Sequence, residues 1–178
     1  VKQDGNTKND CETNAAKRLV PQIRQLLPKE KVAIVEDALS ANGPHIRALK
    51  KERFRFVISV KPDGNKYLFG LFERLGAQGK INEHEWEEGQ HIHQFRYVNG
   101  LPLNSDNRDI KVNFLDYRQI DIRGKEKDKR FTWITDFHLN KHSVYKVMRT
   151  GLGRWKIENE TFNTLKNLGY NFEHNYGH

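Results

Sequence analysis

The segment from Arg154 to Lys166, RWKIENETFNTLK, has the periodicity of an amphipathic helix, yet two charged residues lie on its apolar side. At about 100° per residue, the large apolar side chains fall on one arc: Trp155, Ile157, Phe162, Leu165 and Leu168. Arg154 and Glu158 lie within this arc. Because desolvating an unpaired charge costs several kcal/mol, we expect both side chains to be paired, bound to a metal, or both. A plain i, i+4 ion pair is the alternative that the helical wheel leaves open.

The same residues resemble the carboxy-terminal catalytic signature of DDE transposases from bacterial insertion sequences. In that signature a Tyr is followed by an Arg after two residues, by a Glu after three more and by a Lys after six more. Arg154 and Glu158 have the matching spacing within the pattern RWxIE. Residues 167–178 and 3–18 also resemble segments of one group of these transposases. The resemblance implies that Glu158 is the last of three metal-binding acids.

Two positions depart from the signature. Gly151 stands at the Tyr position, and Leu165 stands at the Lys position, with Lys166 one residue further on. Helical geometry turns Lys166 about 80° away from Glu158, which weakens the prediction that Lys166 contacts phosphate.

The first part of the chain has the pattern of an α/β unit. A helix is predicted from Asp10, its expected cap, to Leu27, and the β-branched run KVAIVED (31–37) predicts a strand buried on both faces. A basic helix around residues 45–53 and a second strand, FRFVISV (54–60), follow. Helix, strand, helix and strand in this order indicate two neighbouring parallel strands.

Asp37 stands where the first of these strands ends. Capping the following turn would be an ordinary role for such an Asp. However, the carboxyl end of a central strand is also where α/β proteins place ligands and chemistry. The stretch VAIVEDALSANGP resembles the surroundings of the second catalytic Asp in ribonuclease-H-like nucleases and transposases, and this resemblance implies that Asp37 is that acid. Alternation along the strand should turn Glu36 to the opposite face.

Residues 63–130 are richer in Gly and charge, and the region is predicted to be mostly antiparallel β-sheet. Asn99-Gly100 and residues 105–109 are expected to form turns. Three runs alternate as strands do: 91–98, 110–122 and 131–137. A β-rich insertion would account for the long separation of Asp37 from Glu158, and transposases with the RWxIE signature carry one.

The predicted fold is therefore α/β, with a ribonuclease-H-like core interrupted by a β-rich insertion between the second and third catalytic acids. Residues 1–61 would form the first part of the core, residues 62–138 the insertion, and residues 139–178 the returning catalytic helix. The first catalytic Asp of this fold precedes the first helix by several strands. Asp4 and Asp10 lie too close to that helix, so we expect the first Asp upstream of Val1 and the chain to be a fragment that is inactive alone.

The resemblance implies metal-dependent cleavage and strand transfer at transposon DNA ends. Two Mg²⁺ ions, for which Mn²⁺ can substitute, would be held by Asp37, Glu158 and the upstream acid. Arg154 would orient Glu158 or contact a DNA phosphate, and Lys156 and Lys166 are further candidates for DNA binding. The implied partners are transposon-end and target DNA and further copies of the chain. Two alternatives remain open: a non-catalytic DNA-binding or assembly module derived from such an element, and a ribonuclease-H-like nuclease without strand transfer.

Composition agrees with a nucleic-acid partner, because 31 Lys and Arg residues against 23 Asp and Glu give a net charge of +8. The sequence has no long apolar run and no signal-like segment, and its single cysteine, Cys11, excludes an internal disulfide. We therefore expect a bacterial cytoplasmic, nucleoid-associated protein that does not enter a membrane.

Several other patterns are weak. His84–Glu88 lacks the second His of a zinc-binding helix. His91 and His93 share a strand face but have no third ligand nearby in the sequence, so solvated or DNA-facing side chains are expected. The run GKEKDKR (124–130) is predicted to be a solvated hairpin tip, and Gly151 and Gly153 form no dinucleotide-binding fingerprint.

Overall fold

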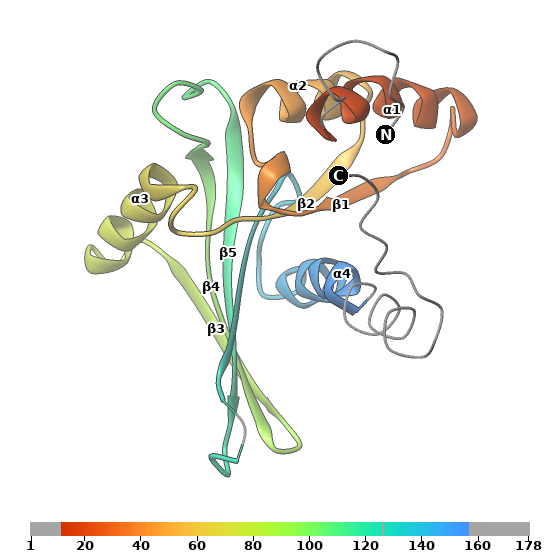
Figure 1. Cartoon of the computed structure of the whole chain (residues 1–178). Helices are drawn as coiled ribbons and strands as arrows, with labels where there is room; N and C mark the ends of the chain where they lie inside the picture. The colour runs from red at the N-terminus through yellow and green to blue at the C-terminus, as the bar shows by residue number, and fades with distance from the viewer. Residues whose placement is uncertain (1–11, 126, 157–178) are drawn as a thin grey trace, which may run out of the picture.

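The computed structural model of this chain describes residues 12–125 and 127–156. These residues form a mixed α/β fold in which four α-helices pack on one six-stranded, mostly antiparallel sheet (Figure 1). The strands are β1 (Ala33–Glu36), β2 (Arg55–Ser59), β3 (Asn82–Glu88), β4 (His91–Pro102), β5 (Lys111–Asp121) and β6 (Lys129–Thr135), and the sheet order is β1-β2-β6-β5-β4-β3. The helices are α1 (Glu12–Leu26), α2 (Gly43–Lys51), α3 (Lys66–Ala77) and α4 (Val144–Lys156), with a 3-10 helix, η1 (Ala38–Ser40).

The α/β unit predicted from the sequence is confirmed. β1 and β2 are parallel neighbours, with Ala33 opposite Arg55 and Glu36 opposite Ile58, and α2 forms the connection between them. α1 includes Pro21 as expected, whereas its predicted cap, Asp10, lies outside the described residues.

One property of β1 was predicted wrongly. Instead of being buried on both faces, β1 has an exposed residue at Ala33 and three half-buried residues after it. The reason is its place in the sheet: β1 is the terminal strand of the part that the structure describes, so only β2 pairs with it there.

α2 ends in a Schellman motif that carries an arginine in place of the usual glycine. The amide of Phe54 donates to the carbonyl of Leu49, and the amide of Arg53 donates to that of Lys50. Arg53 takes the left-handed conformation that this motif requires, with φ of 57°. Such a conformation costs a residue with a Cβ about 1 kcal/mol or more, so the position favours glycine on backbone grounds.

The two halves of the chain join where β2 pairs antiparallel with β6, with Val57 opposite Thr135 and Ser59 opposite Trp133. Beyond the ladder, the hydroxyl of Thr135 donates to the carbonyl of Phe56 at 2.6 Å, and the carboxylate of Asp136 accepts from the amide of Phe56 at 3.0 Å. The strands of the predicted insertion (62–138) thus continue the same sheet as β1 and β2. The division into 1–61, 62–138 and 139–178 stays a prediction.

Asn99-Gly100, predicted to be a turn, lies inside β4 as a β-bulge. Val98 pairs with Phe114 and Leu101 with Val112, so β4 has one residue more than β5 at this point. Gly100 has φ of 77°, which glycine adopts freely. The turn prediction was wrong because residues distant in sequence engage this dipeptide: the side chain of Asn99 exchanges hydrogen bonds with the backbone of Leu139, at 2.9 Å each.

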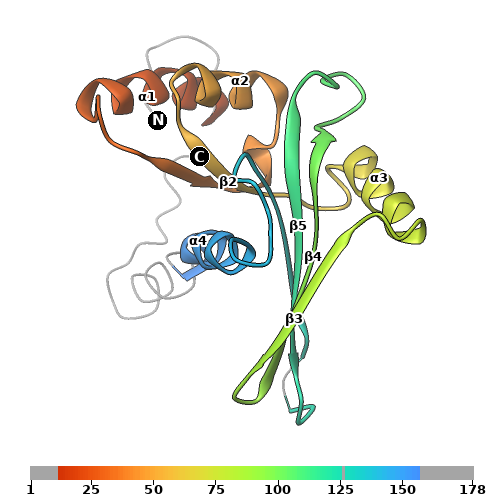
Figure 2. The ribbon, with the colours of Figure 1, turned by 180° about the vertical axis from the view of Figure 1, so that it is seen from behind.

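α3 was not predicted, because residues 63–130 were expected to be mostly strands. Its Leu68, Phe69 and Phe72 are buried, and the two phenylalanine rings contact Phe114 of β5 with centroids 5.1 and 4.5 Å away. α1, α2 and α3 contribute to a hydrophobic core on one face of the sheet, and α4 forms a second core on the other face. Figure 2 shows α3 and α4 on opposite sides of the long strands β4 and β5.

A buried carboxylate fixes β4, β5 and β6 on the α3 side. Asp116 is 1% exposed and accepts two hydrogen bonds from the guanidinium of Arg130, at 2.8 and 2.9 Å. Arg96 lies 3.5 Å from the same carboxylate and also pairs with Glu73 of α3. The hydrogen bonds to Asp116 raise the pKa of Arg130 above its ordinary value. Arg130 therefore belongs to a structural network and not to a solvated hairpin tip, which corrects the prediction for the end of 124–130.

We expect Asp116→Ala to lower the free energy of unfolding by about 2 to 3 kcal/mol, because it leaves the half-buried guanidinium of Arg96 and the more exposed one of Arg130 without their shared buried partner. Urea denaturation measures this loss. Asp109→Ala is the matched control, since it removes an acid whose pair with Arg47 lies in solvent. Equal losses in the two variants would contradict a special role for Asp116.

Candidate active site

Asp37 follows β1 directly and stands at the carboxyl end of the two parallel strands. Its backbone is extended, and its Oδ1 accepts a hydrogen bond from the amide of Leu39 at 3.0 Å, which caps η1. The ordinary capping role considered for Asp37 is thus present. The cap uses one of the two carboxylate oxygens and fixes the orientation of the group, so it is compatible with a further role.

Arg154 comes to Asp37 from the far end of the described chain. α4 packs against β1 and β2 on the face opposite α1 and α2, and Arg154 lies in its last turn. Asp37 and Arg154 together line two cavities. One has a volume of about 340 Å³ and also includes Glu36 and His45; the other, of about 680 Å³, includes Lys61. Two site residues predicted from opposite ends of the sequence therefore face the same space.

Glu36, the acid next to Asp37, is paired with α2. Its Oε2 lies 2.6 Å from Nε2 of His45, whose side chain is 4% exposed. His45 is held in turn at the start of α2, where its amide donates to the side chain of Asn42 at 3.0 Å. Sequence reasoning did not find this pair, because nothing in the local pattern links a strand carboxylate to an imidazole on the next helix.

Gly151, at the position where the transposase signature has Tyr, is required by the packing of α4. A Cβ built on Gly151 would collide with the indole of Trp133, which is 2% exposed and projects from β6. The indole thus fills the space that a side chain at position 151 would need. The departure from the signature has a physical reason in the neighbouring strand.

The other predicted site residues cannot be placed. Glu158 and Lys166 lie outside the described residues, and Lys156 is the last residue of α4, of whose side chain nothing is described. Among residues 12–125 and 127–156, no three His, Cys, Asp or Glu side chains are grouped so that they could hold a metal ion. Asp37 offers one carboxylate and Glu36 is committed to His45, so the described residues alone do not make a magnesium site. The predicted ions depend on Glu158 and on the acid expected upstream.

Of the two histidines of β4, His91 is half-buried and His93 differs from the prediction. His93 is buried instead of solvated or DNA-facing: its Nδ1 lies 2.8 Å from the hydroxyl of Tyr117, and its ring stacks on Trp86. Burial lowers the pKa of His93, an effect that the carboxylate of Glu88 partly opposes. Burial likewise raises the pKa of Tyr117 to about 12. The run His84–Glu88 lies in β3 and so is no zinc-binding helix.

No model of a known protein family matches this chain, and a search of curated proteins finds no match either. In the part of the chain that the structure describes, no helix has both the length and the apolar character needed to cross a membrane.

We expect Gly151→Ala to lower the free energy of unfolding by about 1 to 3 kcal/mol, because the added methyl group must displace the indole of Trp133. Gly151→Tyr, which restores the residue of the signature, should be more destabilising still. Gly153→Ala is the matched control two residues away: a Cβ there meets nothing, and the substitution should stabilise α4 by about 0.5 to 1 kcal/mol. Stabilisation by both Ala variants, measured by thermal unfolding, would contradict the contact.

Stability should fall as the pH drops below about 6.5, in part because of His93. Its pKa in the folded protein is below the ordinary value, so the unfolded chain takes up the proton first and is favoured. The loss begins at the unfolded pKa and ends at the lower folded pKa. Urea titrations of the wild type and His93→Gln, referenced to about pH 8, measure this contribution. Identical pH profiles would contradict it.

Proposed function

We propose that this chain is part of the catalytic domain of a DDE transposase, with a ribonuclease-H-like core and a β-rich insertion. One observation carries the proposal: Asp37, at the carboxyl end of β1, and Arg154, in the last turn of α4, line the same two cavities. The resemblance to DDE transposases, carried by VAIVEDALSANGP for Asp37 and by RWxIE for Arg154, gives each of these residues a place in a single active site.

Asp37 is proposed as the second metal-binding acid. The cap to Leu39 orients its carboxylate, and its position at the ends of β1 and β2 leaves it facing the cavities beneath α4. Two magnesium ions bound between the acids would supply activation of water or of a DNA 3′-hydroxyl and stabilisation of the leaving oxygen at the phosphodiester. Hard cations prefer oxygen ligands, which suits carboxylates for this role.

Arg154 is proposed to orient Glu158, which follows it by one helical turn in sequence, or to contact a DNA phosphate. Arg154 lines both cavities, so its positive charge acts on any anion that enters them. Lys156 and Lys166 are proposed as further phosphate contacts. In the smaller cavity, the second carboxylate beside Asp37, that of Glu36, is already engaged by His45 at 2.6 Å.

The edge of β1 indicates where the missing acid would come from. Within the described residues, β1 pairs only with β2, although three of its four residues are half-buried. An upstream strand that paired in parallel with β1 would bring its carboxyl end beside Asp37, because the ends of parallel strands meet at one edge of a sheet. We propose that the first catalytic Asp lies on such a strand.

The proposed partners are transposon-end and target DNA, with a homodimer or larger assembly forming on them. A net charge of +8 supports attraction to DNA. The protein would then act at the bacterial nucleoid, in the cytoplasm. Cleavage without strand transfer would favour the ribonuclease-H-like nuclease. DNA binding without cleavage would favour the assembly module.

We expect Asp37→Asn to abolish Mg²⁺- or Mn²⁺-dependent nicking and strand transfer, with DNA binding and fold retained. The assay uses the protein with its upstream segment, and labelled transposon-end duplexes report both reactions on gels. Asn is as good a helix cap as Asp, so the bond to Leu39 is kept while the metal-binding charge is lost. Glu158→Gln should have the same effect.

Asp106→Asn is the control, because it removes one exposed acid outside the cavities and should leave both reactions unchanged. Nicking by Asp37→Asn at the wild-type rate would contradict the proposed function.

A further inference from the structure

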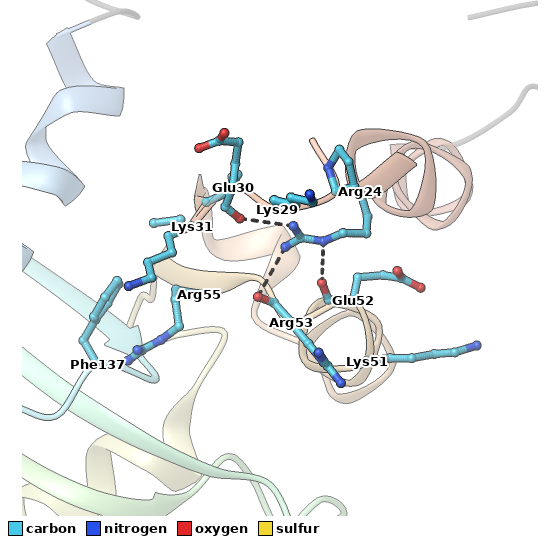
Figure 3. A pocket seen from close by; sticks show the side chains of 12 residues that line it. Arg24, Lys29, Glu30, Lys31, Lys51, Glu52, Arg53, Arg55 and Phe137 are labelled. Carbon is cyan, nitrogen blue, oxygen red and sulfur yellow. Dashed lines mark hydrogen bonds between the residues drawn. The ribbon is translucent and has the colours of Figure 1, made fainter. Parts of the chain in front are cut away.

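A second cavity, rich in basic side chains, lies at the amino end of β1, away from Asp37. It has a volume of about 710 Å³ and lies between the end of α1, the end of α2 and the start of β2 (Figure 3). Two acids, Glu30 and Glu52, are outnumbered on its wall by six cations: Arg24, Lys29, Lys31, Lys51, Arg53 and Arg55. The cavity therefore carries a net positive charge.

Two of the six cations hold the fold together. Arg24 donates to the backbone carbonyls of Glu52 and Glu30, at 2.8 and 3.1 Å. Arg55 pairs with Asp136 at 2.5 Å and lies over the ring of Phe137 at 4.0 Å. These arginines build the wall of the cavity, and their charges are engaged within the protein.

The other four cations serve no such purpose. The side chains of Lys29, Lys31, Lys51 and Arg53 are exposed, and none makes a hydrogen bond or ion pair with another described residue. Like charges that gather without partners repel one another, so a fold alone gives no reason to collect them. An anionic ligand would supply the missing charge.

Of these four residues, Arg53 gives the strongest argument for a ligand, because its backbone conformation is unfavourable for an arginine. It occupies the left-handed position of the Schellman motif, with φ of 57°, where glycine would fit without strain. A strained residue that the fold does not need points to a function for its side chain. Here the residue is an exposed arginine that lines the cavity.

The cations are distributed around the cavity and do not converge on one point. Figure 3 shows Lys31 and Arg55 beside Phe137, while Lys51 and Arg53 lie beyond Arg24, at the end of α2. A single small anion is held by groups aimed at one centre, whereas a chain of phosphates is matched by cations spread along it. The arrangement favours a polyanion.

We propose that this cavity binds the phosphate backbone of DNA, as a contact separate from the Asp37 site. The inference rests on the proposed function for its choice of DNA as the polyanion. Ala33 borders the cavity and Asp37 follows the same strand, so the two sites lie about 13 Å apart along β1. That is the length of only a few base pairs, so one duplex can contact both.

The test compares two triple variants of the same net charge. Lys31→Gln/Lys51→Gln/Arg53→Gly removes three cavity cations, and Lys66→Gln/Arg74→Gln/Lys80→Gln removes three exposed cations on or just after α3. Binding of the full chain to a fluorescent duplex of random sequence is followed by anisotropy between about 50 and 200 mM NaCl.

The cavity variant should lose at least about tenfold in affinity. The slope of its log affinity against log salt concentration should fall in magnitude by about 2 to 3. The α3 variant should keep the wild-type slope.

Arg53→Gly alone separates binding from folding. It should leave the thermal midpoint unchanged or higher, because glycine relieves the positive φ, and it should still lower the salt slope by about 1. A merely structural role for Arg53 predicts a lower midpoint with an unchanged salt slope.

Three results would overturn the proposal: equal losses in the two triple variants, no DNA binding by the wild type at about 50 mM salt, or loss of the difference when phosphate replaces chloride at equal ionic strength. The last result would mean that the cavity takes a single phosphate. The first and third results leave the test of Asp37 unaffected, because that test is scored by cleavage, whereas the second would also count against the proposed function.

Discussion

The short pairing of β2 with β6 is the constraint on which the arrangement of this protein depends. It connects the α/β unit at the start of the chain to the antiparallel strands, and α4 follows shortly after β6. Asp136 reinforces the junction by binding the amide of Phe56 and the guanidinium of Arg55. Without this junction, nothing in the described chain would return Arg154 to the cavities beside Asp37.

The position of α4 depends on one close contact with the sheet. α4 can approach the sheet only because residue 151 has no side chain, which leaves room for the indole of Trp133 on the strand beneath. The same strand borders the larger cavity, so the contact that seats the helix also forms a wall of the candidate site. Packing and site geometry are therefore set by the same residues.

Local patterns predicted the elements whose structure depends on local interactions. The β-branched runs around Val35 and Val57 correctly gave two parallel strands, since their connection through a helix leaves few alternatives. α3 was missed although Leu68, Phe69, Phe72 and Leu75 recur at helical spacing, because the Gly and charge content of the whole region was given more weight. Asn99-Gly100 was misread because its partners are distant in sequence.

The candidate site was predictable only in part, because its contacts also join residues that are distant in sequence. Local patterns marked Asp37 as an acid at a strand end and Arg154 as a charge on an apolar helix face, but only the resemblance joined them in one site. The pairing of Glu36 with His45 and the contact of Gly151 with Trp133 both connect different elements through side chains. Such contacts depend on the tertiary structure, and local sequence patterns do not predict them.

The bulge in β4 has a consequence for how this protein unfolds. Before the extra residue, Phe95 and Tyr97 pack into the core beneath α4, and after it Leu101 packs into the core beneath the other three helices. A single strand is therefore shared by both hydrophobic layers. If one layer unfolds, β4 loses packing that also stabilises the other layer. We therefore expect the two layers to unfold as one cooperative unit.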